Sequence, residues 1–214
     1  MDSNTLIVLG IFVAAIGLIF LRKKGGVKEL FPKSGWIIGP IVNGKNYSVG
    51  MPKTPTMRGR GWSFEFPDSD GSVHAVVNFS PPSLKGKKQI QMQYRVTGSG
   101  FTPSQNRSER ARVGISFQRE GDNWSGKNGY ESYRWYAKVR PVLEEGIAAI
   151  IVDLDPWVWS NVKGKTGDTD LEAFHKAIDN MGNISVVFGG DRDAAHGVFS
   201  SKPAVFEMLS FLVI

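Results

Sequence analysis

Residues 89–96 read Gln-Ile-Gln-Met-Gln-Tyr-Arg-Val, and this stretch decides the fold class. From Ile90 to Val96 every second side chain is apolar, and the residues between them are Gln or Arg. Successive side chains of a β-strand point to opposite faces of the sheet, so a period of two predicts one buried and one wet face. This pattern is typical of an antiparallel sheet.

Similar strands are predicted on both sides of this stretch. Val113, Ile115 and Phe117 alternate with polar residues, and residues 133–140 place Tyr133, Trp135, Ala137 and Val139 opposite Arg134, Tyr136, Lys138 and Arg140. We expect Tyr133 and Trp135 to belong to the core. Residues 147–154 are apolar enough to predict a strand buried on both faces. Further strands are expected at residues 61–66, 73–79, 184–188 and 204–213.

One short helix is predicted in this part of the chain. Thr169 to Glu172 match a capping box, Leu171, Phe174 and Ile178 form an apolar stripe, and Gly182 is a plausible end. Many strands, one helix and no alternation of strand and helix predict a mainly β protein: an antiparallel β-sandwich, in the form of a jelly roll.

A transmembrane helix is predicted before this domain. Residues 3–21 carry no charged side chain, and at about 1.5 Å per residue they would span about 28 Å, close to the thickness of the hydrocarbon core. A cleaved signal peptide would need basic residues before the apolar run, and none is present. We therefore predict an uncleaved anchor with its flank at residues 1–24, a stem at 25–35 and the β-sandwich domain at 36–214.

Basic residues follow the anchor directly, and Arg22, Lys23, Lys24 and Lys28 are expected to lie at the membrane surface. Because such residues stay on the cytoplasmic side, the N-terminus is predicted to lie outside and the β-domain on the cytoplasmic side of a cell or virion membrane. The flank also accounts for much of the net charge of +6, so no nucleic-acid partner is expected.

Composition and motifs exclude several kinds of site. The chain contains no cysteine, which rules out disulfides, thiolate metal sites and a cysteine nucleophile. Asp153 and Asp155 form a carboxylate pair, but turn or structural roles are favoured over acid–base catalysis. Asp155, Asp191 and Asp193 are candidate oxygen ligands for a structural calcium ion. The simpler interpretation is that these residues belong to hydrophilic loops and bind no metal. No other cofactor is expected, and His196 is interpreted as a structural residue.

Aromatic residues are dense between positions 124 and 159. Exposed aromatic rings bind sugars or protein partners, whereas buried rings pack the core. Trp157 and Trp159 are expected to share a strand face. The candidates for ligand or partner binding are Trp124, Tyr130, Tyr136, Trp157 and Trp159.

The C-terminal third resembles a known family. Residues 159–164 read Trp-Ser-Asn-Val-Lys-Gly and residues 174–178 Phe-His-Lys-Ala-Ile; Phe-Gly-Gly at 188–190, His-Gly-Val at 196–198 and Ala-Val-Phe at 204–206 follow. This order resembles jelly-roll domains of the carbohydrate-binding-module type, in the galactose-binding-like group, over about residues 60–214. The resemblance implies a non-catalytic β-sandwich, in some members with a structural calcium ion, and it implies no particular sugar site.

These features favour a non-enzymatic structural protein. We expect a single-pass, membrane-anchored subunit whose partners are the lipid bilayer and other proteins of a larger assembly, either a membrane-containing virion or a multi-subunit membrane complex. The alternative is a glycan-binding module displayed on a membrane, which would need an outward-facing domain. A glycosidase is the third hypothesis, and it has no strong motif in its support.

Overall fold

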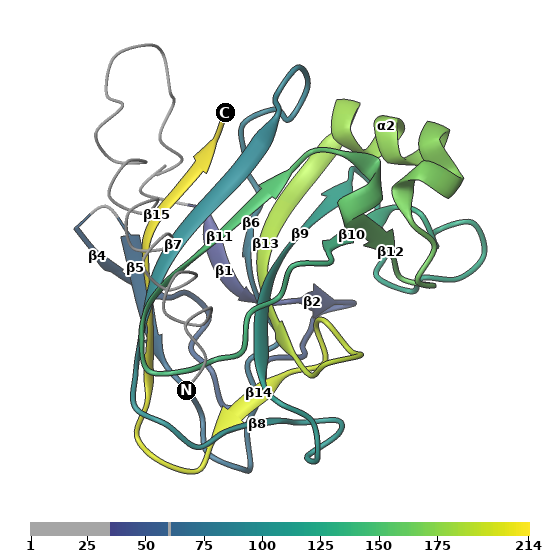
Figure 1. Cartoon of the computed structure of the whole chain (residues 1–214). Coiled ribbons are helices and arrows are strands. Elements are labelled where there is room, and N and C mark those ends of the chain that lie inside the picture. Colours follow the sequence, from purple (N-terminus) through teal and green to yellow (C-terminus); the bar gives the residue numbers. More distant parts are fainter. Residues whose placement is uncertain (1–34, 60) are drawn as a thin grey trace, which may run out of the picture.

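The structure is a computed structural model and describes residues 35–59 and 61–214 (Figure 1). The predicted anchor, its basic flank and almost all of the predicted stem lie outside these residues. Among the described residues, no helix has the length and apolar character needed to cross a bilayer.

Two antiparallel sheets form the body of the molecule. The first has the strand order β1-β6-β13-β9-β10-β12. Its strands are β1 (Trp36–Gly39), β6 (Ala75–Asn78), β13 (Met181–Gly189), β9 (Arg112–Arg119), β10 (Arg134–Ala137) and β12 (Trp159–Asn161). The second has the order β11-β7-β15-β5-β4. Its strands are β11 (Gly146–Asp153), β7 (Gln89–Thr97), β15 (Val205–Val213), β5 (Gly61–Glu65) and β4 (Thr56–Arg58).

Smaller elements join these strands. Two short antiparallel pairs are the hairpin of β2 (Ile41–Val42) with β3 (Lys45–Asn46), and the long-range pairing of β8 (Phe101–Pro103) with β14 (Val198–Ser200). The helical elements are the 3₁₀ turns η1 (Pro156–Val158) and η2 (Gly167–Asp170) and the α-helix α2 (Leu171–Asp179). The prediction of a mainly β protein of antiparallel sheets with one short helix is thus confirmed for the described residues.

The core lies between the two sheets. The predicted inward residues of β7, from Ile90 to Val96, are all buried, as are Val113, Ile115 and Phe117 of β9. Phe188 of β13 meets two rings of the other sheet, Phe64 and Phe206, at centroid distances of 5.4 and 5.1 Å. These contacts tie the sheets together face to face.

The helix α2 extends the core beside β9 and β10 (Figure 1). Phe174 is fully buried, and its ring lies 5.7 Å from Phe117 and 5.2 Å from Trp135. Leu171, predicted for the same apolar stripe, is 48% exposed, because the helix begins only at this residue and turns it outward.

The predicted capping box does not form. Asp170 is the N-cap residue, no side chain caps the first turn, and Glu172 pairs instead with Lys176 one turn later. The helix ends at Asp179, and Gly182 belongs to β13 rather than to the helix end. The 3₁₀ turn η2 takes up Thr169 and Asp170, so Thr169, the predicted N-cap, lies inside that turn and the prediction was wrong.

Two strand predictions also need correction. Residues 147–154 are not buried on both faces: β11 is an edge strand, and Ile147 and Ile151 on its outer face are 53% and 41% exposed. Conversely, the outer face of β9 is not exposed to solvent as predicted, since Ser116 and Gln118 are buried there. An alternating pattern shows which side chains share a face, but not which loops cover that face.

Replacing Phe174 with alanine tests the docking of α2. We expect the free energy of unfolding to fall by about 3–5 kcal/mol, because the change empties a fully buried aromatic site. Chemical denaturation measures the loss. In the matched control Leu171→Ala on the same helix, the change should stay within about 1 kcal/mol, and an equal loss in both variants would contradict this packing.

Candidate functional site

A groove crosses the outer face of the six-stranded sheet, the face turned away from the core. It consists of two adjoining hollows of about 480 and 380 Å³. The hollows share the lining residues Trp124, Ser125, Arg134, Tyr136, Ala195 and His196. The strand β10 and the ring of Trp124 supply the floor, and the rest of the loop 119–131, the segment 160–164 and the loop 190–197 supply the walls.

Alternation along the strands explains why these side chains meet. In β10, Trp135 and Ala137 point into the core, so Arg134 and Tyr136 point outward. In β6 and β13, Ala75, Val77 and Val187 form a small apolar patch on the same outer face. Trp124, Tyr136 and Ala195 pack against this patch, which gives the groove an apolar base.

Trp124 is held in place by charged neighbours. Asp122 accepts a hydrogen bond from the backbone N–H of Trp124 at 3.0 Å and forms an ion pair with Arg134 at 2.9 Å. The guanidinium carbon of Arg134 lies 4.3 Å from the ring centroid of Trp124, within the range of a cation–π contact. Trp124 has a φ of 65°, an uncommon value for a residue other than glycine. These contacts fix the ring on the groove floor while leaving part of it exposed.

Polar side chains are buried beside this floor. Ser116 and Gln118 of β9 and Asn183 and Ser185 of β13 all point to the outer face. Among the described residues, the Ser116 and Ser185 hydroxyls and both amide atoms of Gln118 have no hydrogen-bond partner. Burying polar groups without a hydrogen-bond partner costs free energy.

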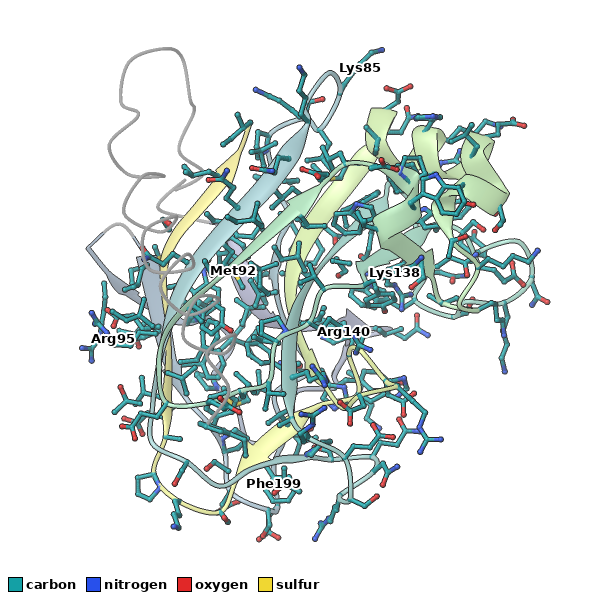
Figure 2. The ribbon with its side chains drawn as sticks, viewed as in Figure 1. Lys85, Met92, Arg95, Lys138, Arg140 and Phe199 are labelled. Atoms are coloured by element: carbon teal, nitrogen blue, oxygen red, sulfur yellow. The ribbon has the colours of Figure 1, made fainter. Side chains whose placement is uncertain are left out.

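One end of the groove is rich in basic residues. The larger hollow is lined by Lys138, Arg140, Lys163 and Arg192, together with a single carboxylate, Asp193. Figure 2 shows Lys138 and Arg140 on the segment that leaves β10. Arg140 donates to the carbonyl of Gly190 at 3.0 Å, which links this segment to the 190–197 loop.

The other end is aromatic and contains histidine. Pro40, Val42, Tyr47, His74 and Asn123 line the smaller hollow besides the shared residues. His74 Nδ1 lies 3.1 Å from the carbonyl of Ala195. Burial lowers the pKa of His74 to about 4; the bond to Ala195 opposes this shift, and the nearby His196 adds to it. His74 is therefore neutral at pH 7.

The predicted aromatic candidates divide into three groups. Trp124 and Tyr136 lie together in the groove. The ring of Tyr130 lies tilted against that of Tyr133, with centroids 4.8 Å apart, and Trp157 is 65% exposed on η1; neither lines the groove. Trp159 is fully buried against Phe117, so it has no surface for a ligand.

Two predictions about shared faces are wrong. Trp157 and Trp159 lie in different environments, because the 3₁₀ turn η1 interrupts the strand between them. Tyr133 precedes β10 and is only partly buried, with its ring under the guanidinium of Arg119 at 4.6 Å.

The calcium candidates do not converge. Asp191 forms an ion pair with Arg112, Asp193 lines the groove, and Asp155 accepts a hydrogen bond from the backbone N–H of Trp157 at 3.0 Å. Among the described residues, no three acidic or histidine side chains are grouped as metal ligands. Asp153 accepts a hydrogen bond from the side-chain amide of Gln89 at 2.8 Å, and it does not line the groove.

Several groove residues were missed as candidates, although a signal for them existed. Arg134, Lys138 and Arg140 were expected on the same strand face as the candidate Tyr136, and all four line the larger hollow. His74, Lys163 and Arg192 come from segments distant in sequence, and no local pattern connects them.

Comparison with known proteins gives a loose resemblance of fold. No protein-family model and no curated protein matches the chain. Among solved structures it is similar to the xylan-binding module CBM15, with 14% identity, a TM-score of 0.39 and coverage of 87% of this chain and 97% of that one. It is also similar to CBM28, a carbohydrate-binding module specific for non-crystalline cellulose, with 12% identity, a TM-score of 0.41 and coverage of 88% and 95%.

A third similar structure is that of black queen cell virus, with 10% identity, a TM-score of 0.30 and coverage of 90% of this chain and 73% of that one. The loose resemblance to carbohydrate-binding modules expected from the sequence is therefore found in the structure as well. Identities and TM-scores this low locate no ligand site in this chain.

The buried His74 predicts a dependence of stability on pH. The pKa in the folded protein, about 4, is below the ordinary 6.5, so the unfolded chain takes up the proton first and stability falls as pH drops from about 6.5 to 4. Between pH 7 and 5, the free energy of unfolding should fall by about 1–2 kcal/mol more in the wild type than in His74→Asn. Urea denaturation at both pH values measures this. His175→Asn, at an exposed histidine, should behave as the wild type, and equal slopes in wild type and His74→Asn would refute the assignment.

Proposed function

We propose that the β-sandwich domain is a non-catalytic saccharide-binding domain, with its binding site in the groove of the six-stranded sheet. The observation that carries the proposal is the ring of Trp124, held partly exposed on the groove floor beside Tyr136 by the Asp122–Arg134 ion pair.

The groove offers both kinds of contact that a sugar ring needs. A pyranose has apolar faces, which stack on aromatic rings, and a rim of hydroxyl groups, which require hydrogen-bond partners. Trp124, Tyr136 and Tyr47 supply aromatic surface, while Asn123, Ser125 and Ser160 supply polar groups. A few placed polar groups in a mostly preformed hollow are characteristic of ligand sites.

The acidic residues of the groove favour binding over hydrolysis. Most enzymes that cleave glycosidic bonds use two carboxylates on opposite sides of the bond. Asp193 is the single carboxylate among the described residues that line the two hollows. Asp153 and Asp155, the pair considered from the sequence, lie outside this lining, so they do not complete such a site.

A second function is suggested by the opposite side of the molecule. The edge strand β11 exposes Ile147 and Ile151, and edge strands with apolar side chains pair readily with other chains. Together with the apolar segment 3–21, this supports the expectation of a membrane-anchored subunit that contacts other proteins of a larger assembly. A domain that binds an extracellular saccharide must face outward, which is opposite to the orientation that the basic flank predicts, so the two roles are compatible only with an outward-facing domain.

Replacing Trp124 tests the binding function. In Trp124→Ala we expect saccharide affinity to fall at least about tenfold, since a central aromatic contact is commonly worth more than 1.4 kcal/mol. A glycan array followed by calorimetry on the best ligand measures this. Trp157→Ala, at an exposed ring outside the groove, should bind as the wild type.

Stability is the necessary control for this experiment, because Trp124 also packs against the apolar patch of β6 and β13. Trp124→Phe keeps part of that packing and should retain intermediate affinity with a near-normal unfolding midpoint. Undiminished binding in Trp124→Ala, or no saccharide binding by the wild type, would refute the proposal.

The membrane role has a separate test. A chain lacking residues 1–24 should move from the membrane fraction to the soluble fraction after cell disruption. In intact cells, protease added outside should leave the full-length domain uncleaved if it faces the cytoplasm. Cleavage from outside would reverse the orientation, and membrane retention of the truncated chain would contradict the anchor.

A further inference from the structure

The groove is electrically uneven along its length. One hollow is lined by Lys138, Arg140, Lys163 and Arg192 against Asp193, whereas the lining of the other ends in Pro40, Val42 and Tyr47. Trp124 and Tyr136 lie where the two hollows meet. If one sugar ring of a ligand stacks on Trp124, the next ring on one side therefore lies beside cationic groups, and the next ring on the other side does not.

Some of these cations already have a partner. Arg192 forms an ion pair with Glu109 at 2.8 Å, and Arg134 forms one with Asp122. The hydrogen bond and charge of Arg192 lower the pKa of Glu109, so this pair stays ionised at neutral pH.

Lys138 and Arg140 differ from these two. Their recorded hydrogen bonds go to backbone carbonyls: Lys138 to Trp157, and Arg140 to Gly190 and Asp191. Neither takes part in an ion pair with any described residue. Lys163 is exposed on the rim of the same hollow.

Arg140 is half-buried and has charged neighbours of both signs. Burial is the main cause that lowers the pKa of Arg140, and Arg112 lowers it further; Asp191, Asp193 and Glu109 act in the opposite direction, but Asp191 is paired with Arg112 and Glu109 with Arg192. A partly buried cation gains most from an anion that can form charge-assisted hydrogen bonds with it.

We propose, on the basis of the saccharide-binding function above, that the ligand is an acidic saccharide. Its carboxylate or sulfate group lies at the end formed by Lys138, Arg140 and Lys163, and an adjacent sugar ring stacks on Trp124. Arg140 is suited to a planar carboxylate or a sulfate, and the two lysines supply point charges at the rim.

The groove fits a saccharide better than a nucleic acid. Proteins that bind single strands without sequence preference line the whole path of the backbone with positive charge. Here Lys138, Arg140, Lys163 and Arg192 line one hollow only. The other contains the neutral His74 with Pro40 and Val42, and Arg134, which lines both hollows, is paired with Asp122. An acidic saccharide, with one charged group next to a neutral ring that stacks on Trp124, matches this division of charge between the two hollows.

The test compares chemically matched polymers on the full-length chain in detergent. The acidic probes are polygalacturonate and dextran sulfate, and their neutral partners are carboxyl-reduced polygalacturonate and dextran. We expect at least tenfold tighter binding to one acidic probe than to its neutral partner, with affinity falling as salt is raised. The two pairs distinguish a carboxylate from a sulfate ligand.

Variants assign the effect to the groove. Lys138→Gln with Lys163→Gln should remove most of the preference for the acidic probe and keep the residual binding to the neutral one. Lys127→Gln, at an exposed lysine of the 119–131 loop that does not line either hollow, should leave the preference intact. Neutralising Arg22, Lys23 and Lys24 together should also leave it intact, because these residues belong to the membrane flank.

The outcomes separate the two proposals. Equal or tighter binding to the neutral polymers overturns the acidic ligand but leaves saccharide binding in place. A preference lost only in the flank variant, or tighter binding to single-stranded DNA or to vesicles of anionic lipid, also overturns it. Failure to bind any saccharide overturns the proposed function itself.

Discussion

The rest of the molecule depends on the position of Phe188 between the two sheets. Its ring meets Phe64 and Phe206 nearly at right angles, at 88° and 89°, which is the edge-to-face geometry that aromatic pairs prefer. Because a strand alternates its faces, an inward Phe188 directs Val187 and Ser185 outward. A shift of one residue would turn Phe188 to the surface and remove the apolar base of the groove. Core packing and the candidate site are thus set by a single register.

The six-stranded sheet is covered on both faces, although its sequence pattern is that of a half-exposed sheet. The five-stranded sheet covers the inner face, and the loop 119–131 covers part of the outer one. That loop is held by the Asp122–Arg134 pair, both of whose side chains are nearly inaccessible to solvent. Removing one partner of such a pair leaves a buried charge alone, which costs several kcal/mol. The loop is therefore a fixed wall of the groove.

Local patterns in the sequence predicted much of the fold. The inward residues of β7 and β9 followed from alternation, and the same rule predicted that Arg134, Tyr136, Lys138 and Arg140 share one face. The edge position of β11 could not be predicted, because sheet order depends on contacts between segments far apart in the chain. The covering of Ser116 and Gln118 was missed for the same reason. His74 and Lys163 reach the groove only through the complete topology, so no local motif marks them.

The distribution of the six tryptophans has a consequence for optical work. Trp36, Trp62, Trp135 and Trp159 are buried in the core, Trp157 is exposed, and Trp124 is partly exposed on the groove floor. Rings shielded from water emit at shorter wavelengths than rings that contact it. The long-wavelength edge of the emission therefore belongs to Trp157 and Trp124, and in a chain with phenylalanine at position 157 it belongs to the groove. Trp124 is therefore an intrinsic fluorescent probe at the centre of the candidate site.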